Sequence, residues 1–309
     1  MVKYTIQRIA YMIITLLIIA TATFFLMKLL PGSPLTNVEK LSPEQQELIL
    51  DRYGLNDPIP VQYVRYMTNL AQGDLGVSFI YDGRSVTKII SERIGPSAQL
   101  GFQALVIGTI IGLAMGIIAA LKHNTIFDYG STFIAVIGIS VPGFVFAALL
   151  QYYVGVELQW LPVALWEGWE YSILPTISLT VIVIANIARF MRSEMLEVLG
   201  SDYILLARAK GISSAAIVIK HGIRNALIPV ITILGPMTVG LMTGTLVIEQ
   251  IFAVPGLGPQ FVQSINTNDY PIIMGITIFF SFLFIAVIFI VDILYGIVDP
   301  RIRLAGGKK

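Results

Sequence analysis

Residues 202–229 read DYILLARAKGISSAAIVIKHGIRNALIP. The segment is polar and basic, with Arg208, Lys210, Lys220 and Arg224 along it, and long apolar runs lie on both sides. Because each of those runs is long enough to cross a lipid bilayer, the segment between them is where a molecule in the aqueous phase can make contact.

The composition is that of an integral membrane protein. Of the 309 residues, 56% are hydrophobic and 13% are charged, whereas charged residues make up about 25% of a soluble domain. The apolar residues form runs of about 20, the length of a helix that crosses a hydrocarbon core of roughly 30 Å. The net charge of +1, without a basic tract interleaved with aromatic residues, gives no indication of nucleic-acid binding. The chain has no cysteine, which excludes disulfides and cysteine-ligated metals.

We predict an all-α fold with six transmembrane helices. The first apolar run is longer than the hydrophobic region of a signal peptide and leads into Pro31-Gly-Ser-Pro34 rather than a cleavage site, so we interpret it as a retained helix. The predicted spans are residues 9–30, 97–121, 127–156, 173–199, 227–250 and 271–298. The chain then divides into the N-terminus with the first span (1–30), an extracellular segment (31–96), a five-helix core (97–298) with a cytoplasmic segment at 200–226, and a cytoplasmic tail (299–309).

The distribution of Lys and Arg predicts the orientation. Lys3 and Arg8 precede the first span, the tail is basic, and the segment between the fourth and fifth spans is rich in both residues. Residues 157–172 and 251–270 contain neither. Because short cytoplasmic loops carry the excess of Lys and Arg, both termini are predicted to be cytoplasmic.

The extracellular segment is expected to hold three short helices at the membrane surface. Ser42-Pro43-Glu44-Gln45 offers an N-cap, a proline at the first helical position and a capping-box glutamine, and Gly54 offers a stop. The other two helices are predicted at 60–71 and 85–94. In the last one, four apolar residues share a face: Val86, Ile89, Ile90 and Ile94. These helices either cover the bundle or dock an extracellular partner.

Small and polar residues interrupt the predicted spans. Gly108, Gly112 and Gly116 recur at every fourth position, a spacing that lets helices approach closely, within one chain or between subunits. Prolines and polar groups occur together in the third, fourth and fifth spans. Such breaks are tolerated where they line a cavity, so we predict a polar pathway between these spans, with kinks for packing as the alternative. The candidate pathway residues are Ser140, Pro142, Asn186, Pro236, Thr238 and Thr243.

The sequence contains no recognisable catalytic motif. There is no HExxH, no Gly-x-Ser paired with a membrane histidine, and no G-x-x-x-x-G-K-[ST] phosphate-binding loop. No series of acidic residues crosses the predicted spans, which weakens a proton-coupled mechanism. We interpret the chain as a conduit whose energy, if any is used, comes from another protein.

The basic segment is predicted to form two helices. Ser201-Asp202 can start a short helix that ends at Lys210, with Gly211 as its stop, and Ser213 can start a second helix that runs to about Asn225. From the residues alone, the segment is either a basic loop on anionic lipid or a helix that inserts into a groove on a soluble partner.

A resemblance decides between these alternatives. Residues 202–203 read DY, 207–211 read ARAKG and 224–229 read RNALIP, which resembles the cytoplasmic signature of ABC-importer permeases of the oligopeptide/dipeptide/nickel branch. The resemblance extends over essentially the whole chain. It includes residues 3–34 with their Pro-Gly-x-Pro exit, the loop from Glu249 to Gly258, Asp269-Tyr270-Pro271, and the ending Asp299 to Arg303. Counted back from Gly211, Leu205, Leu206 and Ala207 stand where the general importer motif has an acidic residue and two alanines.

The resemblance implies a type I importer fold in the plasma membrane of a bacterium, with this chain as a non-catalytic permease subunit. The implied partners are a homologous second permease, two ATPases that bind ATP and Mg, and an extracellular substrate-binding protein. The chain itself is expected to bind no cofactor and no metal. The implied substrate is a peptide, with oligopeptides favoured over dipeptides. Nickel is less favoured, because no cluster of His, Cys or Met faces the proposed pathway.

The resemblance also implies roles for individual residues. Those implied to couple to the ATPases are Asp202, Tyr203, Ala207, Arg208, Ala209, Lys210 and Gly211. Those implied to gate the outer cavity or contact the binding protein are Glu249, Phe252, Pro255, Gly256 and Gly258. Two other classes stay as alternatives. A secondary transporter would carry acidic residues at mid-membrane or an internal repeat, and a membrane-anchored scaffold would not need kinked spans.

Overall fold

A computed structural model describes residues 2–29, 42–81, 83–242 and 246–298. These ranges are helical apart from turns and loops, and Val77 and Ser85 form an isolated β-bridge. The chain divides into two compact units. The first unit comprises residues 1–95 and 256–286, and the second unit comprises residues 96–255 and 287–309.

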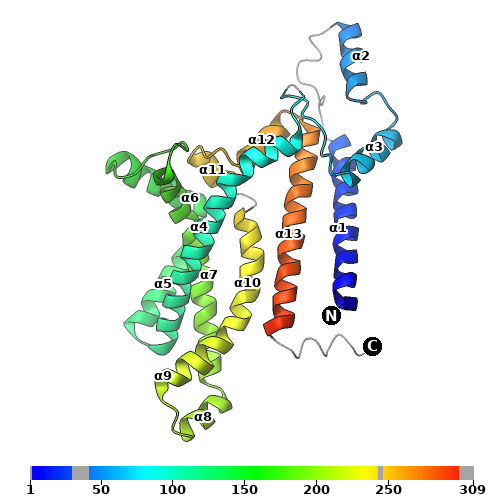
Figure 1. Cartoon of the computed structure of the whole chain (residues 1–309). Helices are drawn as coiled ribbons and strands as arrows, with labels where there is room; N and C mark the ends of the chain where they lie inside the picture. Colours follow the sequence, from blue (N-terminus) through cyan, green and yellow to red (C-terminus); the bar gives the residue numbers. More distant parts are fainter. Residues whose placement is uncertain (1, 30–41, 82, 243–245, 299–309) are drawn as a thin grey trace. The chain divides into compact units, whose positions relative to one another are not determined.

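Long helices dominate the structure (Figure 1). Within the described ranges, five helical stretches are long and apolar enough to cross a membrane: Thr5–Lys28, Val86–Leu121, Trp169–Leu199, Ser214–Leu241 and Tyr270–Val291. A sixth span results if Ile126–Ser140 and Gly143–Glu157, which meet at 99°, are counted as one. The prediction of an all-α protein with several membrane spans is confirmed, and the number of six spans stays a prediction.

The first unit contains α1 (Val2–Lys28), α2 (Pro43–Arg52), α3 (Ile59–Ala71), the start of α4 (Val86–Leu121), α12 (Leu257–Asn266) and the first part of α13 (Tyr270–Val298). α2 begins as predicted, because the Ser42 N–H donates to Gln45 Oε1 at 3.3 Å and the Gln45 N–H donates to Ser42 Oγ at 3.4 Å. These reciprocal bonds form a capping box. Gly54 follows the helix with a φ of +64°, a conformation that glycine adopts without steric cost.

The predicted surface helix 85–94 is wrong as a separate element. α4 continues without interruption through Pro96. A proline normally disfavours the helical conformation of the residue before it, partly by a clash with that residue's Cβ. Here the preceding residue is Gly95, which has no Cβ. The predicted apolar face is confirmed, and its buried members pack with residues of α12 and α13: Val86, Ile89 and Ile90 with Leu257, Ile272 and Ile276.

A buried carboxylate ties the loop before α4 to the start of α13. Asp269 is 1% exposed. Its Oδ2 accepts a hydrogen bond from the Ser78 hydroxyl, and its Oδ1 accepts one from the Phe79 N–H at 3.2 Å. The Ser78 oxygen in turn accepts from the N–H groups of Ile80 and Tyr81 at 3.1 and 2.8 Å. Burying a carboxylate without donors is costly, so this network holds the loop in place within the first unit.

The second unit is built around a central helix, α7 (Ile173–Leu199). Before it come the rest of α4, α5 (Ile126–Ser140), α6 (Gly143–Leu150), the π-helical η2 (Gln151–Glu157) and the 3-10 turn η3 (Trp169–Ser172). After it come α8 (Asp202–Ala209), α9 (Ser214–Ala216), the π-helical η4 (Ile217–Ile223), α10 (Arg224–Met242) and α11 (Leu246–Ile251). The α7 side chains that recur every fourth residue are buried in one apolar core with α4, α6, α10 and α11: Leu179, Val183, Ile187, Met191 and Met195.

The glycines of α4 lie directly against α7. A Cβ added at Gly108 would lie 2.5 Å from Val183 Cβ, and one at Gly112 would lie 2.8 Å from Ile187 Cβ. One at Gly116 would lie 2.7 Å from an α7 carbonyl oxygen. A side chain does not fit at these separations without a shift of one helix. The glycine spacing therefore serves packing within one chain, which was one of its two predicted uses.

The helix after α8 differs from the prediction at its end. The predicted helix from Ser213 to Asn225 does not stop before the fifth span, because Ser214–Leu241 is one helical stretch with Pro229 inside it. A proline removes one backbone hydrogen bond, but its φ is that of a helix. Ala226 and Val230 on either side are fully buried, so packing keeps the stretch helical.

Candidate functional site

α8 is a short helix whose ends are stabilised by its own sequence. Asp202 lies in its first turn and Arg208 in its last, an arrangement of charges that complements the helix dipole. At its end, the Gly211 N–H donates to the Arg208 carbonyl at 3.0 Å and the Ile212 N–H donates to the Ala207 carbonyl at 3.2 Å. These are the two bonds of a Schellman motif, and Gly211 has the required positive φ of +75°. The predicted helix with its glycine stop is confirmed.

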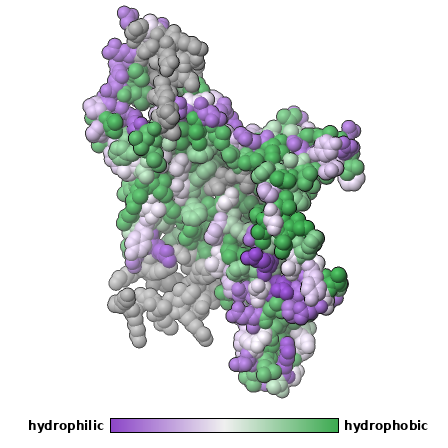
Figure 2. Space-filling model, turned by 180° about the vertical axis from the view of Figure 1, so that it is seen from behind, coloured by the Kyte–Doolittle hydropathy of each residue, from purple (hydrophilic) through white to green (hydrophobic). Residues whose placement is uncertain are grey.

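α8 has one buried face and one exposed face. Ile204 and Ala207 pack against Ile217 of η4 and Leu199 of α7. The exposed side chains of α8 are Asp202, Tyr203, Leu205, Leu206, Arg208 and Ala209, and Lys210 after the helix is exposed as well. Leu205 and Leu206 are 66% and 57% exposed, so the outward face is an apolar pair beside basic residues. Figure 2 shows many hydrophilic residues at the end of the second unit that carries α8, and mostly hydrophobic residues along the long helices next to it.

A hydrogen bond connects α8 to α10. The Asn225 side-chain amide donates to the Tyr203 hydroxyl at 3.1 Å. Beside this bond lies a hollow with a basic rim, lined by Ile219, Lys220, His221, Arg224, Asn225 and Ile228. α8 is also joined to α7 by only two residues, Gly200 and Ser201. The helix is therefore attached to both α7 and α10.

An ion pair with a buried carboxylate fixes the C-terminal part of α7 to the start of α5. Asp128 is 1% exposed, and Arg192 donates to both of its carboxylate oxygens, through Nε to Oδ1 and through Nη2 to Oδ2 at 2.9 Å. The Asn124 N–H donates to Oδ2 at 3.0 Å, and His123 Nδ1 lies 2.8 Å from the same oxygen. Bidentate guanidinium–carboxylate pairs of this kind are strong and directional. Arg192 lies seven residues before the end of α7, about 10 Å of helix, so the pair positions the end of α7 that carries α8.

The sequence reasoning missed the roles of four residues here. Asp128 was not singled out, Arg192 counted only toward the charge of the segment, and Leu205 and Leu206 appeared only as a departure from the importer motif. The helical spacing could have separated Leu205 and Leu206 from Ile204 and Ala207. Among the predicted coupling residues, all except Ala207 are exposed. Ala207 is 7% exposed and packs within the chain, so its contribution is to hold α8 in place.

The predicted outer residues are mostly buried. Glu249 and Phe252 are each 1% exposed, and Pro255 is exposed. The Phe252 carbonyl accepts from the Leu165 N–H at 2.9 Å, which ties the loop before α7 to the end of α11. Gly256 and Gly258 belong to the first unit, where Gly256 precedes α12 in an extended conformation and both are buried.

The predicted pathway residues lie on helices that surround α7 or on α7 itself. Ser140 and Pro142 are exposed at the 99° bend between α5 and α6, so the predicted interruption of the third span is confirmed. Asn186 donates to the Ile182 carbonyl at 2.8 Å, and Thr238 donates to the Leu234 carbonyl at 2.7 Å. Each polar group is thus satisfied by its own helix. Pro236 lies inside α10 and is exposed, and Thr243 lies outside the described residues.

Comparison with protein families identifies the chain. Residues 112–304 match the family described as "Binding-protein-dependent transport system inner membrane component". Residues 1–95 match "Binding-prot-dependent transport system membrane comp, N-term".

Two solved structures share the fold over part of the chain. An amino acid ABC transporter structure covers 67% of this chain and 93% of its own, with a TM-score of 0.54 at 15% identity. The MetNI methionine ABC transporter covers 69% and 97%, with a TM-score of 0.53 at 18% identity.

Curated relatives are similar along their full length. The dipeptide transport system permease protein DppB of Lactococcus lactis is 46% identical over 304 residues, covering 98% of this chain and 100% of its own. DppB of Bacillus subtilis is 44% identical, with 98% and 99% covered. The oligopeptide transport system permease protein OppB of Haemophilus influenzae is 43% identical, with 98% and 100% covered. As its signature strings predict, the chain belongs to the family of binding-protein-dependent transport system inner membrane components.

Proposed function

We propose that this chain is the permease subunit of an ATP-driven peptide importer in the bacterial plasma membrane, with both termini in the cytoplasm. It would form half of the translocation pathway, beside a homologous second permease. Two ATPases, which carry ATP and Mg, would bind below it, and a substrate-binding protein would bind above. The chain would bind no cofactor and catalyse no reaction. The observation that carries the proposal is the exposed apolar and basic face of α8, on a helix held to α7 and α10.

α8 is the proposed coupling element. Its exposed leucines would enter a groove on an ATPase, with Arg208 and Lys210 against acidic residues at the rim. When ATP binding moves the ATPase, Ile204 and Ala207 would push on α7, and the Tyr203–Asn225 bond would pull on α10. Since the predicted pathway residues lie on α7, α10 and the α5–α6 bend, this movement would alternate access to the pathway.

The loop from Glu249 to Gly258 is proposed to face the binding protein or to gate the outer cavity. Of the residues predicted to act in this loop, Pro255 is the exposed one, so it would contact the binding protein. Glu249 and Phe252 would act by holding the loop in shape, because both are buried in the second unit.

The proposed substrate class is peptides. The relatives named above include dipeptide and oligopeptide permeases at nearly equal identity, so the permease sequence does not separate the two lengths. The separate binding protein would set the length preference. ATPase activity measured with the binding protein loaded with a dipeptide or with a longer peptide would distinguish the alternatives.

The proposal is tested by purifying the chain from native membranes with its associated proteins. We expect a second permease and two ATPases, with ATP hydrolysis stimulated by a peptide-loaded binding protein in lipid nanodiscs. Leu206→Asp should remove the ATPases from the purified complex, because a carboxylate would be buried without a partner in the groove. Recovery of the wild-type chain without an ATPase would contradict the proposal and favour a secondary transporter.

A matched control uses the same substitution elsewhere. Leu48 of α2 is 71% exposed, more than the 57% of Leu206, and α2 is predicted to be extracellular. Leu48→Asp should leave the ATPases bound. Equal loss in both variants would show a general effect of the added charge rather than a docking role for α8.

A further inference from the structure

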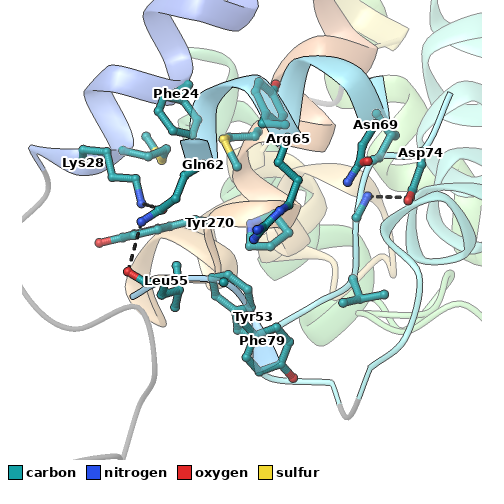
Figure 3. A pocket seen from close by; sticks show the side chains of 18 residues that line it. Phe24, Lys28, Tyr53, Leu55, Gln62, Arg65, Asn69, Asp74, Phe79 and Tyr270 are labelled. Atoms are coloured by element: carbon teal, nitrogen blue, oxygen red, sulfur yellow. Dashed lines mark hydrogen bonds between the residues drawn. The ribbon is translucent and has the colours of Figure 1, made fainter. Parts of the chain in front are cut away.

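The first unit contains a cavity of about 230 Å³ at the ends of two predicted spans (Figure 3). A cavity that holds one water needs only about 10–15 Å³, so this one can take a larger molecule. The span of α1 ends at Lys28 and that of α13 begins at Tyr270, and both residues line the cavity. A site between the ends of two membrane helices lies at the depth of lipid headgroups.

Most of the cavity wall is aromatic or apolar. Phe24 and Met27 of α1 and Met274 of α13 lie within the candidate spans, so the apolar wall continues along helices long and apolar enough to cross a membrane. Further rings come from Tyr53 and Phe79, whose centroids are 4.7 Å apart. A wall of this kind suits the glycerol and acyl region of a lipid better than a fully hydrated solute.

Lys28 is held in place at one side of the cavity. Its ammonium donates to Gln62 Oε1, and the Gln62 amide nitrogen donates to the carbonyls of Leu55 and Asp57 at 3.0 and 2.7 Å. An ammonium has three donors, so Lys28 can serve Gln62 and an anionic ligand together. Figure 3 shows Lys28 and Asp74 on opposite sides, with the Arg65 side chain between them.

Tyr66 contributes its ring to the wall of the cavity. The ring stacks on that of Phe24, with the centroids 5.6 Å apart. The Tyr66 hydroxyl is fully buried and forms no hydrogen bond with any described residue, so it does not open into the cavity. Tyr66 therefore shapes the wall and is not a donor to a ligand in the cavity.

We propose that this cavity binds a phospholipid with a phosphoethanolamine headgroup. The phosphate accepts from Lys28, and the ammonium lies toward Asp74, whose Oδ1 also accepts from the Gly76 N–H at 2.8 Å. Arg65 contributes little net charge, because Asp57 is paired with it. A cation at one side and a carboxylate at the other match a zwitterion, whereas a lipid with a net negative charge would leave Asp74 opposed to it. Bound lipid would join α1 to α3 and α13 in the assembled protein.

The test measures lipid retained by the full-length protein after purification in detergent, by mass spectrometry of extracted lipids. The protein is first exchanged into equimolar phosphatidylethanolamine and phosphatidylglycerol, or into diacylglycerol. We expect phosphatidylethanolamine to be retained most and diacylglycerol, which lacks the phosphate, to be lost. Lys28→Met should lower retention about tenfold, the effect of one hydrogen bond to a charged group. Asp74→Asn should abolish the preference between the two phospholipids.

A matched control makes the test specific. Lys88→Met makes the same change on an exposed lysine of α4 that does not line the cavity, and it should leave retention unchanged. Equal retention in Lys28→Met and Lys88→Met would overturn the proposal. Displacement of the lipid by excess dipeptide would also overturn it and identify the cavity as a peptide site.

Discussion

The side-chain amide of Asn225, in the first turn of α10, donates a hydrogen bond to the hydroxyl of Tyr203 on α8 at 3.1 Å. These residues are 22 positions apart, and the bond joins the short helix directly to a long one. The contact of Ile204 and Ala207 with Leu199 joins the same helix to α7. Any displacement of α8 is therefore delivered to two long helices at once.

Tyr203→Phe should uncouple hydrolysis from transport. The exposed bond contributes about 0.5–1.5 kcal/mol, so the fold should persist while peptide moved per ATP falls two- to tenfold. Uptake and hydrolysis measured together in proteoliposomes check this ratio. Asn225→Ala should have the same effect, and the double variant should be no worse than either single one. Additive effects would show that the two residues act separately.

Asp128→Asn should destabilise the second unit by about 1.5–3 kcal/mol, because it removes the charge-assisted hydrogen bonds to the Arg192 guanidinium, which is 26% exposed. Thermal unfolding in detergent measures the loss. Arg192→Gln should cost a similar amount, since it strands a buried charge. The pair of changes together should cost less than the sum, and a fully additive cycle would show that the ion pair contributes nothing.

Gly112→Ala should destabilise the packing of α4 on α7 by about 1–3 kcal/mol, since the new methyl group overpacks the interface. The clash with Ile187 at 2.8 Å is with a Cβ atom, which cannot rotate away. Gly130→Ala is the matched control, because a Cβ there meets nothing within 4 Å. In the control, the better helix propensity of alanine should leave stability unchanged or slightly higher. The unfolding temperatures of the two variants test this prediction, and an equal change in both would contradict it.

Gly211→Val should loosen the end of α8. At a φ of +75° a β-branched residue is strained, by about 1–2 kcal/mol, and the Schellman bonds would weaken. Gly211→Asn should be milder, because asparagine tolerates the left-handed region. No atom lies within 4 Å of a Cβ at this position, so the backbone conformation alone separates the variants. The amount of ATPase that co-purifies should decrease from the wild type to Gly211→Asn and then to Gly211→Val. Equal amounts in all three proteins would contradict a coupling role for the C-terminal cap of α8.

Local signals in the sequence predicted the elements whose cause is local. The capping box at Ser42 and Gln45, the apolar face of Val86 and Ile90, and the stop at Gly211 all depend on residues within one or two turns. The long helices followed from runs of apolar residues whose length matches a bilayer. The break near Pro142 also appeared where the sequence placed it.

Features that depend on packing between distant segments escaped prediction. Arg192 meets Asp128 across 64 positions, and Ser78 meets Asp269 across 191. No spacing rule specifies such pairs. Gly95 explains why α4 passes through Pro96, but a sequence reading that treats every proline as a boundary ends the helix there. Ala207 was assigned to the partner surface, while its neighbours Leu205 and Leu206 are the exposed ones.

The exposed leucines of α8 have a consequence for biosynthesis. Leu205 and Leu206 stand more than half uncovered at the tip of the second unit, next to polar residues. Exposed apolar groups in an aqueous compartment promote aggregation and attract chaperones. Under the proposed function, a chain synthesised in excess over the ATPases would keep these leucines exposed until it is degraded. The amount of permease that accumulates should therefore depend on simultaneous synthesis of the proteins that cover these leucines. The subunits would then be present in matched amounts.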